Sequence, residues 1–273
     1  MFKWRRSAGT KRASDRPLPQ AAKPRRDSLL EAVIAHERVA LLFQPQIEPA
    51  TGHIRGVEAL ARWEGTDSAD KLFARAAAAG LSERLSRLMQ RKALRAAAAW
   101  EGPLRRLGVS INVLPQDLAR PGYDQWLLEE IEAAGIAPTR VTVEITETAL
   151  VADREAVSQR LDRLRRIGIT VALDDFGTGY ASLSYLGGLP LDALKIDRGL
   201  ITGIAERERD RIVVQGVIRL ARELGLKVIV EGVESTNQLA LLADWGCDLY
   251  QGFLGSVALD EHNLARFVGA AAA

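Results

Sequence analysis

The sequence predicts an α/β protein built as a closed (β/α)8 barrel. From about Ser28 onward, short apolar runs alternate with segments of helical periodicity, which is the pattern of repeated βαβ units. Several runs are continuous in Val, Ile and Leu, as strands are when both faces of a parallel sheet are covered. The alternating region, residues 28–273, is close to the ~250 residues typical of one such barrel. The eight predicted strands are residues 41–47, 54–63, 107–114, 141–147, 169–175, 193–197, 227–232 and 248–254.

An open, doubly wound parallel sheet is the alternative architecture. Proteins of that class commonly bind nucleotides through glycine-rich phosphate loops. The chain contains neither G-x-G-x-x-G after its first predicted strand nor G-x-x-x-x-G-K-[ST]. The closed barrel is therefore preferred, and nucleotide binding of those two types is not expected.

The segments between the predicted strands have the signals of amphipathic helices. Two of them place apolar residues at i, i+4 and i+7, which is one face of a helix. Ser235 followed by Gln238 predicts a capping box at a helix start, and the alanine runs 76–79 and 96–99 favour helix. The two stripes are Val157, Leu161 and Leu164, and Val213, Val217 and Leu220 continued by Leu224; the glycines predicted to end helices are Gly135, Gly168, Gly225 and Gly246.

Charge is distributed unevenly along the chain. The formal net charge is +2, yet residues 1–27 carry nine Lys or Arg against two acidic residues. This segment is rich in Pro, Ser and Ala and has no apolar period, so it is predicted to be a disordered basic tail before a folded domain of residues 28–273. Such a tail can touch anionic surfaces. Its few aromatic residues give no base-stacking platform, so no nucleic-acid polymer is predicted as a partner.

The composition predicts a cytoplasmic protein. Cys247 is the single cysteine, which excludes an internal disulfide and fits a reducing compartment. A mean hydropathy of −0.04 and the lack of a long apolar run argue against a membrane span. No apolar segment of a secretory signal follows the basic start.

Polar residues recur near the ends of the predicted strands. Burying a single carboxylate in a strand is costly because the charge loses its hydration, so its repetition indicates a shared purpose. In a parallel barrel the carboxyl ends of the strands meet at one face. Five carboxylates can gather there only if cations offset their repulsion, and hard oxygen ligands suit Mg²⁺ or Mn²⁺. The residues are Glu58, Asn112, Glu144, Asp174, Asp175, Lys195, Glu231 and Gln251.

Two of these acids are adjacent, and this predicts a bend in the chain. Asp174 and Asp175 would point to opposite faces of an ideal strand. If both reach a metal, the chain must turn there, and Gly177 and Gly179 directly afterwards supply the flexibility for a turn.

This ligand set predicts hydrolysis at phosphorus with two cations. Two metals ~3.5–4 Å apart clamp an in-line displacement and generate hydroxide near neutral pH. Lys195 could neutralise charge on the attacking water or on the phosphate. The three histidines, His36, His53 and His262, lie outside the predicted site segments, which weighs against a zinc site or a Ser-His-Asp triad.

Taken in order, the motifs resemble those of the EAL domain family. The E-A-L tripeptide alone has little weight in a chain rich in Ala and Leu, but the ordered set is highly specific. The resemblance covers roughly residues 29–268. The motifs are Glu58-Ala59-Leu60 with Arg62, then Asn112, Glu144 to Glu147, Asp174 to Tyr180, Lys195 to Asp197, Glu231 to Glu234 and Gln251 to Phe253, with Gln44-Pro45 upstream.

The resemblance implies a (β/α)8 barrel whose first strand is antiparallel. It further implies a phosphodiesterase that hydrolyses cyclic di-GMP to linear pGpG with two Mg²⁺ or Mn²⁺ ions and that forms a homodimer. Carried over, the first metal would be held by Glu58, Asn112, Glu144 and Asp174, and the second by Asp174, Asp175 and Glu231.

The resemblance also implies catalytic and substrate-binding roles. Lys195 would orient or activate the water, Glu231 would be a ligand or a general base, and Glu147 would brace the loop after Asp175. The dinucleotide would be contacted by Gln44, Leu60, Arg62 and Gln251, with Arg62 on a phosphate.

Two departures from the family pattern leave a second function open. The run Ala76–Ala79 stands where relatives have an acidic wall that touches a guanine, and Gly255, Val257 and Ala258 replace an aromatic, a basic residue and Pro. The alternative is therefore a weak or inactive EAL domain that acts as a cyclic di-GMP receptor or a protein-interaction module. Locally, Glu58 with Arg62 could also be a structural ion pair. The sequence names no regulator, so a separate regulatory partner is expected.

Overall fold

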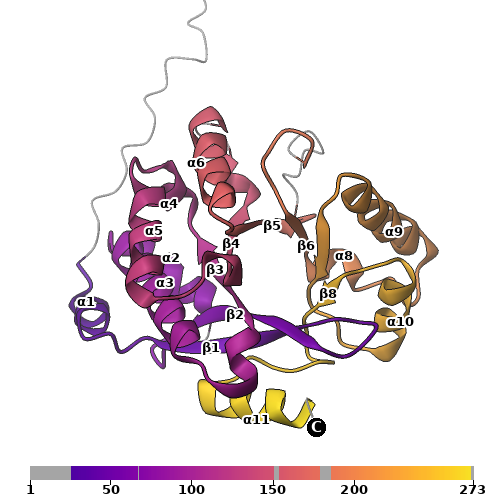
Figure 1. Ribbon diagram of the computed structural model, residues 1–273, viewed down its shortest axis with the longest axis horizontal. Coiled ribbons are helices and arrows are strands. Elements are labelled where there is room, and N and C mark those ends of the chain that lie inside the picture. Colours follow the sequence, from indigo (N-terminus) through magenta and orange to yellow (C-terminus); the bar gives the residue numbers. More distant parts are fainter. Residues whose placement is uncertain (1–25, 67, 151–153, 179–185, 272–273) are drawn as a thin grey trace, which may run out of the picture.

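A computed structural model describes residues 26–66, 68–150, 154–178 and 186–271. Its eight strands close into a barrel in sequence order (Figure 1), which confirms the predicted fold and excludes the open sheet. β1 runs antiparallel to both of its neighbours, and the other pairs are parallel. The strands are β1 (Ala40–Ile47), β2 (Ile54–Arg62), β3 (Gly108–Val113), β4 (Val141–Thr146), β5 (Thr170–Phe176), β6 (Ala193–Ile196), β7 (Lys227–Val230) and β8 (Leu249–Tyr250).

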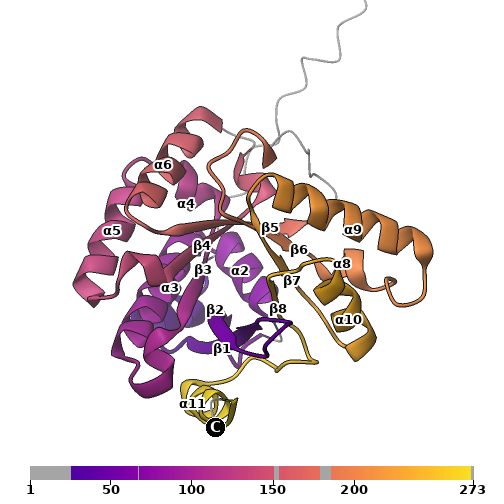
Figure 2. The ribbon, with the colours of Figure 1, turned by 45° about the vertical axis from the view of Figure 1, so that its right-hand side comes forward.

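Helices surround the strands (Figure 2). Most of them follow a strand and cover the outside of the barrel. In the described part of the chain, 3-10 turns complete the connections at η2 (Gly102–Arg106), η3 (Pro138–Arg140) and η4 (Glu147–Leu150). The helices are α1 (Ser28–Ala35), α2 (Ala69–Ala78), α3 (Ser82–Ala99), α4 (Pro115–Ala119), α5 (Tyr123–Ala134), α6 (Arg154–Arg166), α8 (Arg198–Ile201), α9 (Glu208–Glu223), α10 (Thr236–Asp244) and α11 (Glu261–Ala271).

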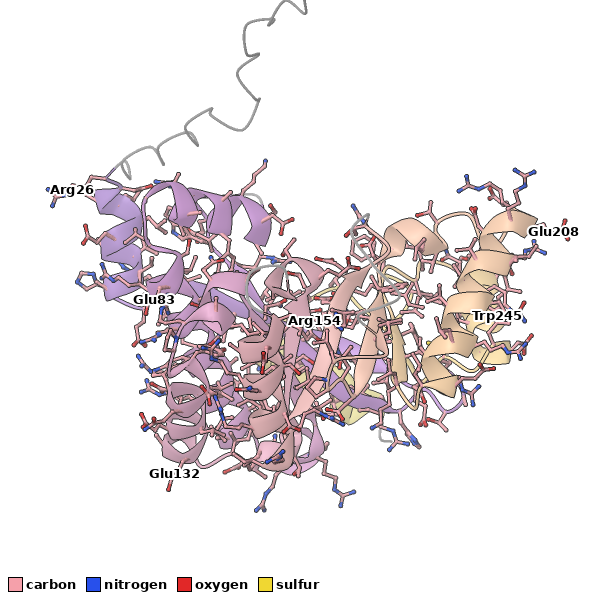
Figure 3. The ribbon with its side chains drawn as sticks, turned by 90° about the horizontal axis from the view of Figure 1, so that it is seen from above. Arg26, Glu83, Glu132, Arg154, Glu208 and Trp245 are labelled. Carbon is pink, nitrogen blue, oxygen red and sulfur yellow. The ribbon has the colours of Figure 1, made fainter. Side chains whose placement is uncertain are left out.

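The predicted tail lies almost wholly outside the described residues, as do Gly179 and Tyr180. Asp27, which the sequence placed in the tail, is the N-cap of α1 and accepts a hydrogen bond from the backbone N–H of Leu30. It also forms an ion pair with Arg75 of α2, with 2.6 Å between Nε and Oδ2. Asp27 is therefore part of the fold that the structure describes. Seen from above, Arg26 and Glu208 at the start of α9 lie at opposite ends of the molecule (Figure 3).

One of the two predicted helical stripes faces the core as expected. Val157, Leu161 and Leu164 of α6 are fully buried, and the capping box of Ser235 and Gln238 is formed at α10. The predicted terminating glycines all have positive φ.

The α9 stripe was predicted one residue out of register. The residues that α9 buries are Val214, Ile218 and Ala221, whereas Val213 is 51% and Leu224 is 43% exposed. α9 carries apolar residues on two overlapping faces, and the periodicity of the sequence does not determine which of them meets the barrel.

Two large apolar cores hold the described domain together, beside a small third cluster of Ala172, Ala193 and Ile229 on β5, β6 and β7. The larger joins the barrel strands to the helices outside them. The smaller packs α1, α2 and the start of α3 through residues such as Leu30, Leu72 and Leu85. Among the described residues, none of the helices has the length and apolar character needed to cross a membrane.

Candidate metal centre

The ammonium of Lys195 is surrounded by four carboxylates inside the barrel. Its Nζ lies 2.7 Å from Oε1 of Glu231 and 2.8 Å from Oε2 of Glu144. Oδ2 of Asp174 and Oε2 of Glu58 follow at 3.1 Å and 3.3 Å. The Lys195 side chain is fully buried, so residues that are far apart in sequence meet around one charge, as the strand pattern predicted.

Side-chain amides orient two of these carboxylates. Asn112 Nδ2 donates to Oε1 of Glu58 over 3.0 Å. Gln251 Nε2 donates to Oε2 of Glu58 over 2.7 Å and to Oε1 of Glu231 over 3.1 Å. Because the side-chain amide nitrogen of Asn112 faces Glu58, the side-chain oxygen Oδ1 of Asn112 is available as a ligand.

Gln46 is a buried residue of the site that the motifs missed. Its amide donates to Oε1 of Gln251 and to the hydroxyl of Ser110, each over 3.4 Å. The available signal was strand alternation, since Gln44 and Gln46 lie two apart in β1 and therefore share a face.

The chain bends at the two adjacent aspartates, as predicted. Asp175 has φ of +58°, and the register between β5 and β6 shifts between Leu173 and Phe176. The backbone N–H of Asp175 donates to Oδ1 of Asp174 over 2.8 Å. The left-handed residue turns the Asp175 side chain out of the strand alternation and toward the same end of the barrel as Asp174.

Burial and mutual repulsion raise the pKa of most of these acids. Burial raises the pKa of Glu231 to about 8 and keeps that of Glu144 well above its ordinary value. Burial, followed by the charge of Asp174, raises the pKa of Asp175 to about 6. Burial raises the pKa of Asp174 in the same way.

For Glu58 and Lys195, the neighbouring groups outweigh the effect of burial on the pKa. Burial opposes the charge of Glu58, but Lys195 and the neighbouring amides outweigh it and lower the pKa of this carboxyl. Burial likewise opposes the charge of Lys195, but Asp174 and the other acids raise the pKa of the ammonium well above its ordinary value.

The acids form two oxygen clusters that could each hold a cation. Glu58, Glu144 and Asp174 offer oxygens within 4.8 Å of one another, and so do Asp174, Asp175 and Glu231. Asp174 belongs to both clusters. Glu144 Oε1 is buried without a hydrogen-bond partner among the described residues, which is an open ligand position. All-oxygen donors of this kind fit Mg²⁺ or Mn²⁺.

A cavity of about 400 Å³ opens over the acids. One side is formed by the strand ends, and the other is a wall of mixed apolar and polar side chains from α2 and α3. Predicted residues that line it are Gln44, Glu58, Leu60, Asn112, Asp174, Asp175, Glu231 and Gln251; wall residues that the sequence did not single out include Asp70, Phe73, Ser86, Met89 and Gln90.

The alanine run and Arg62, both singled out in the sequence, lie outside the lining of this cavity. The alanine run is not part of the cavity lining, and Ala76 is fully buried in the smaller core. Arg62 does not line the cavity either; its guanidinium donates to the backbone oxygen of Ala61 over 2.8 Å. Among the described residues, Glu58 and Arg62 form no ion pair. Glu58 pairs with Lys195 instead.

Glu147 lies beside the bend, outside both oxygen clusters. It begins η4 directly after β4 and is 5% exposed. Neither of its carboxylate oxygens has a regular hydrogen bond to the described residues. Burial and the charge of Asp175 raise the pKa of Glu147, and the backbone N–H of Gly177 opposes that rise. Glu147 is therefore coupled electrostatically to Asp175.

A (β/α)8 barrel with two oxygen clusters that share one aspartate defines a candidate two-cation centre. A family model described as the EAL domain matches residues 26–257. The chain belongs to the EAL domain family.

Relatives of known name support this assignment. Cyclic di-GMP phosphodiesterase NbdA of Pseudomonas aeruginosa is 36% identical over 246 residues, covering 88% of this chain and 31% of NbdA. The bifunctional diguanylate cyclase/cyclic di-GMP phosphodiesterase MucR of the same species is 32% identical over 230 residues, covering 82% of this chain and 34% of MucR. This chain therefore spans about a third of the length of these relatives.

Solved structures agree with the fold. The PaMucR phosphodiesterase in complex with c-di-GMP matches with a TM-score of 0.80 and 30% identity, covering 86% of this chain and 97% of that chain. BlrP1 of Klebsiella pneumoniae, in a manganese and cy-diGMP complex, matches with a TM-score of 0.74 and 33% identity, covering 81% and 56% of the two chains.

Proposed function

We propose that this protein hydrolyses cyclic di-GMP to linear pGpG with two divalent cations, Mg²⁺ or Mn²⁺. The observation that carries the proposal is the position of Asp174 in both oxygen clusters around Lys195. The names of the relatives and the cyclic di-GMP in the similar structures support the choice of substrate.

The first cation would be held by Glu58, Asn112, Glu144 and Asp174. The second would be held by Asp174, Asp175 and Glu231. Bound cations would supply Lewis-acid stabilisation and lower the pKa of a coordinated water.

Side chains of the protein would orient the attacking water and the phosphate and would neutralise their negative charge. Lys195 would place its buried positive charge next to the attacking water and the phosphate. Gln251, whose amide reaches Glu58 and Glu231, would lie beside the attacked phosphorus.

Glu231 would be a ligand of the second cation or a general base. Burial raises its pKa to about 8 in the absence of cations, and a bound cation would lower that pKa again because it favours the charged carboxylate. Both roles need the deprotonated carboxylate, which a neighbouring cation would provide.

Substrate would occupy the cavity above the acids. Gln44 and Leu60 line it next to the acids and would contact the dinucleotide. Arg62 would have to leave the Ala61 carbonyl to reach a phosphate. Glu147 would brace the loop after Asp175 through the coupling described above.

The assembly proposed with this activity is a homodimer in the cytoplasm, with a separate regulatory partner. Likeness to the family supports the dimer, and the single Cys247 fits a reducing compartment. Light scattering on the purified protein would report the dimer mass. The basic tail would add contact with anionic surfaces.

The decisive experiment is turnover by protein stripped of metal and then titrated with Mg²⁺ or Mn²⁺. We expect pGpG to accumulate only with added cation and Asp174→Ala to abolish it while the fold is kept. Binding of cyclic di-GMP without pGpG would replace the proposal with the receptor function. Absence of both binding and turnover would favour a protein-interaction module.

A further inference from the structure

A buried polar network lies directly behind the cavity wall, between α3, α5 and the end of β3. Gln90 is at its centre. Gln90 Nε2 donates to the backbone oxygen of Asn112 over 3.0 Å and to the hydroxyl of Ser86 over 3.1 Å. The hydroxyl of Tyr123 donates to Oε1 of Gln90 over 3.0 Å. Gln90, Ser86 and Tyr123 are each at most 2% exposed.

The hydrogen bonds of Gln90 determine what it can do. Its amide has two N–H donors, and both are used within the network. Although Gln90 lines the cavity, it has no N–H donor left for a bound molecule. Its role is therefore directed at Asn112 rather than at substrate.

The network continues beyond Ser86. Burial raises the pKa of the fully buried Asp117 carboxylate in α4, and the nearby Ser86 hydroxyl opposes that rise; Arg120 pairs with the same carboxylate over 3.3 Å. Gln90 is thus held from two sides, by Ser86 and by Tyr123. A side chain locked in this way places its donor at one defined point.

Asn112 links this network to the acids. Its backbone oxygen accepts from Gln90, and its side-chain amide donates to Oε1 of Glu58. Fixing the peptide plane that follows Asn112 limits the rotation of the residue at the end of β3. Partners of this kind, one layer behind the ligands, orient the ligands of metal sites.

We propose that Gln90 and Tyr123 are positioning residues for the first cation site. They hold Asn112 so that its amide oxygen and Glu58 face the same cation. This inference rests on the proposed function, because it requires that a cation binds there.

The test measures Mn²⁺ binding by electron paramagnetic resonance on the full chain, with unfolding in urea as a second readout. Gln90→Met keeps the volume but removes all three hydrogen bonds, and Tyr123→Phe removes one hydroxyl. Ile131→Val, in the core face of α5, is the matched control, because it also lowers stability without touching the network.

We expect two Mn²⁺ sites in the wild-type protein. Gln90→Met should weaken one of them by about tenfold or more, Tyr123→Phe by a smaller factor, and Ile131→Val should leave both unchanged. The double variant, Gln90→Met with Tyr123→Phe, should be more stable than Gln90→Met alone, because it no longer buries an unpaired Tyr123 hydroxyl. Its Mn²⁺ affinity should stay low, which separates positioning from stability.

Unchanged Mn²⁺ affinity in Gln90→Met would overturn the inference. So would a loss of Mn²⁺ affinity that is proportional to the loss of stability across Gln90→Met, Tyr123→Phe, their combination and Ile131→Val. If the wild-type protein hydrolyses cyclic di-GMP and binds two Mn²⁺, either result removes this inference alone. If the wild-type protein binds no Mn²⁺ and forms no pGpG, both proposals fail.

Discussion

At the scale of single residues, the charge of the centre depends on Lys195. Its ammonium meets four carboxylates within 3.3 Å and is the positive group that offsets them in the absence of cations. Three of those acids, Glu144, Asp174 and Glu231, have raised pKa values. The cation-free centre therefore combines one buried lysine with acids that give up their protons less readily than free carboxyl groups.

Replacing this lysine should destabilise the cation-free protein most. We expect Lys195→Met to lower the free energy of unfolding by about 3–5 kcal/mol at pH 8, because it leaves buried carboxylates unpaired. Added Mn²⁺ should restore part of that loss, since the ion supplies positive charge, whereas turnover should remain abolished. Urea unfolding with and without Mn²⁺ measures this. Equal stability of variant and wild type in EDTA would contradict the central role of Lys195.

At the scale of elements, the end of β5 combines a turn of the backbone with the acids of the second oxygen cluster. The left-handed Asp175 and, two residues later, Gly177 with φ of +108° turn the chain. A Cβ at Gly177 would lie 2.3 Å from Cδ1 of Leu200 in α8. Backbone conformation and close packing therefore both require glycine there. The sequence predicted this bend from two adjacent acids and the glycines that follow.

An alanine at this bend should cost stability and weaken the second cation cluster. We expect Gly177→Ala to destabilise by roughly 1–3 kcal/mol and to reduce Mn²⁺ binding, because the turn holds Asp175. Gly216→Ala is the matched control, since Gly216 lies within α9 with open space around its Cβ position. That variant should gain about 0.5–1 kcal/mol. Similar effects from both substitutions in urea unfolding would argue against strain at Gly177.

The start of α1 allows a test of the domain boundary. Asp27 caps α1 and pairs with Arg75, so removing residues 1–25 should leave the melting temperature and turnover unchanged. Removing Asp27 as well should lower stability by about 1 kcal/mol through loss of the cap. Melting temperatures of the two truncations decide this. A large loss from the shorter truncation would show that the basic segment contributes to the fold.

At the scale of the whole molecule, barrel closure brings the site together. Residues of β2, β4, β5 and β6 and the segment after β7 converge because the carboxyl ends of the parallel strands β2 to β8 reach the same face. β1 closes the ring antiparallel, with Ile47 paired to Tyr250 of the short β8. This closure places Gln251 against Glu58.

Because the acids are gathered in one centre, the stability of the cation-free protein should fall as the pH rises, whereas its affinity for cations should increase. With pKa values of about 6 for Asp175 and about 8 for Glu231, the folded cation-free protein binds more protons than the unfolded chain. Its stability should fall as pH rises from the ordinary carboxyl range to about 8. Cation affinity should rise over the same window, because cations displace these protons.

Calorimetry in EDTA and in Mn²⁺ between pH 5 and 9, with Asp174→Ala as control, measures both effects. The stability added by cation should grow with pH in the wild type and vanish in the variant. A cation effect that is independent of pH would contradict protonated acids in the centre.

The sequence by itself determined the barrel, its eight strands and the acids at their ends. These follow from local periodicity, from strand length and from the cost of burying charge, which can be assessed along the chain. The tertiary structure decided which face of α9 is buried, that Asp70 and Phe73 rather than the alanine run form the wall, and that Gln46 and Gln90 complete the polar contacts. Those features depend on the register and closure of strands distant in sequence, and periodicity carries no information about which side chains then touch.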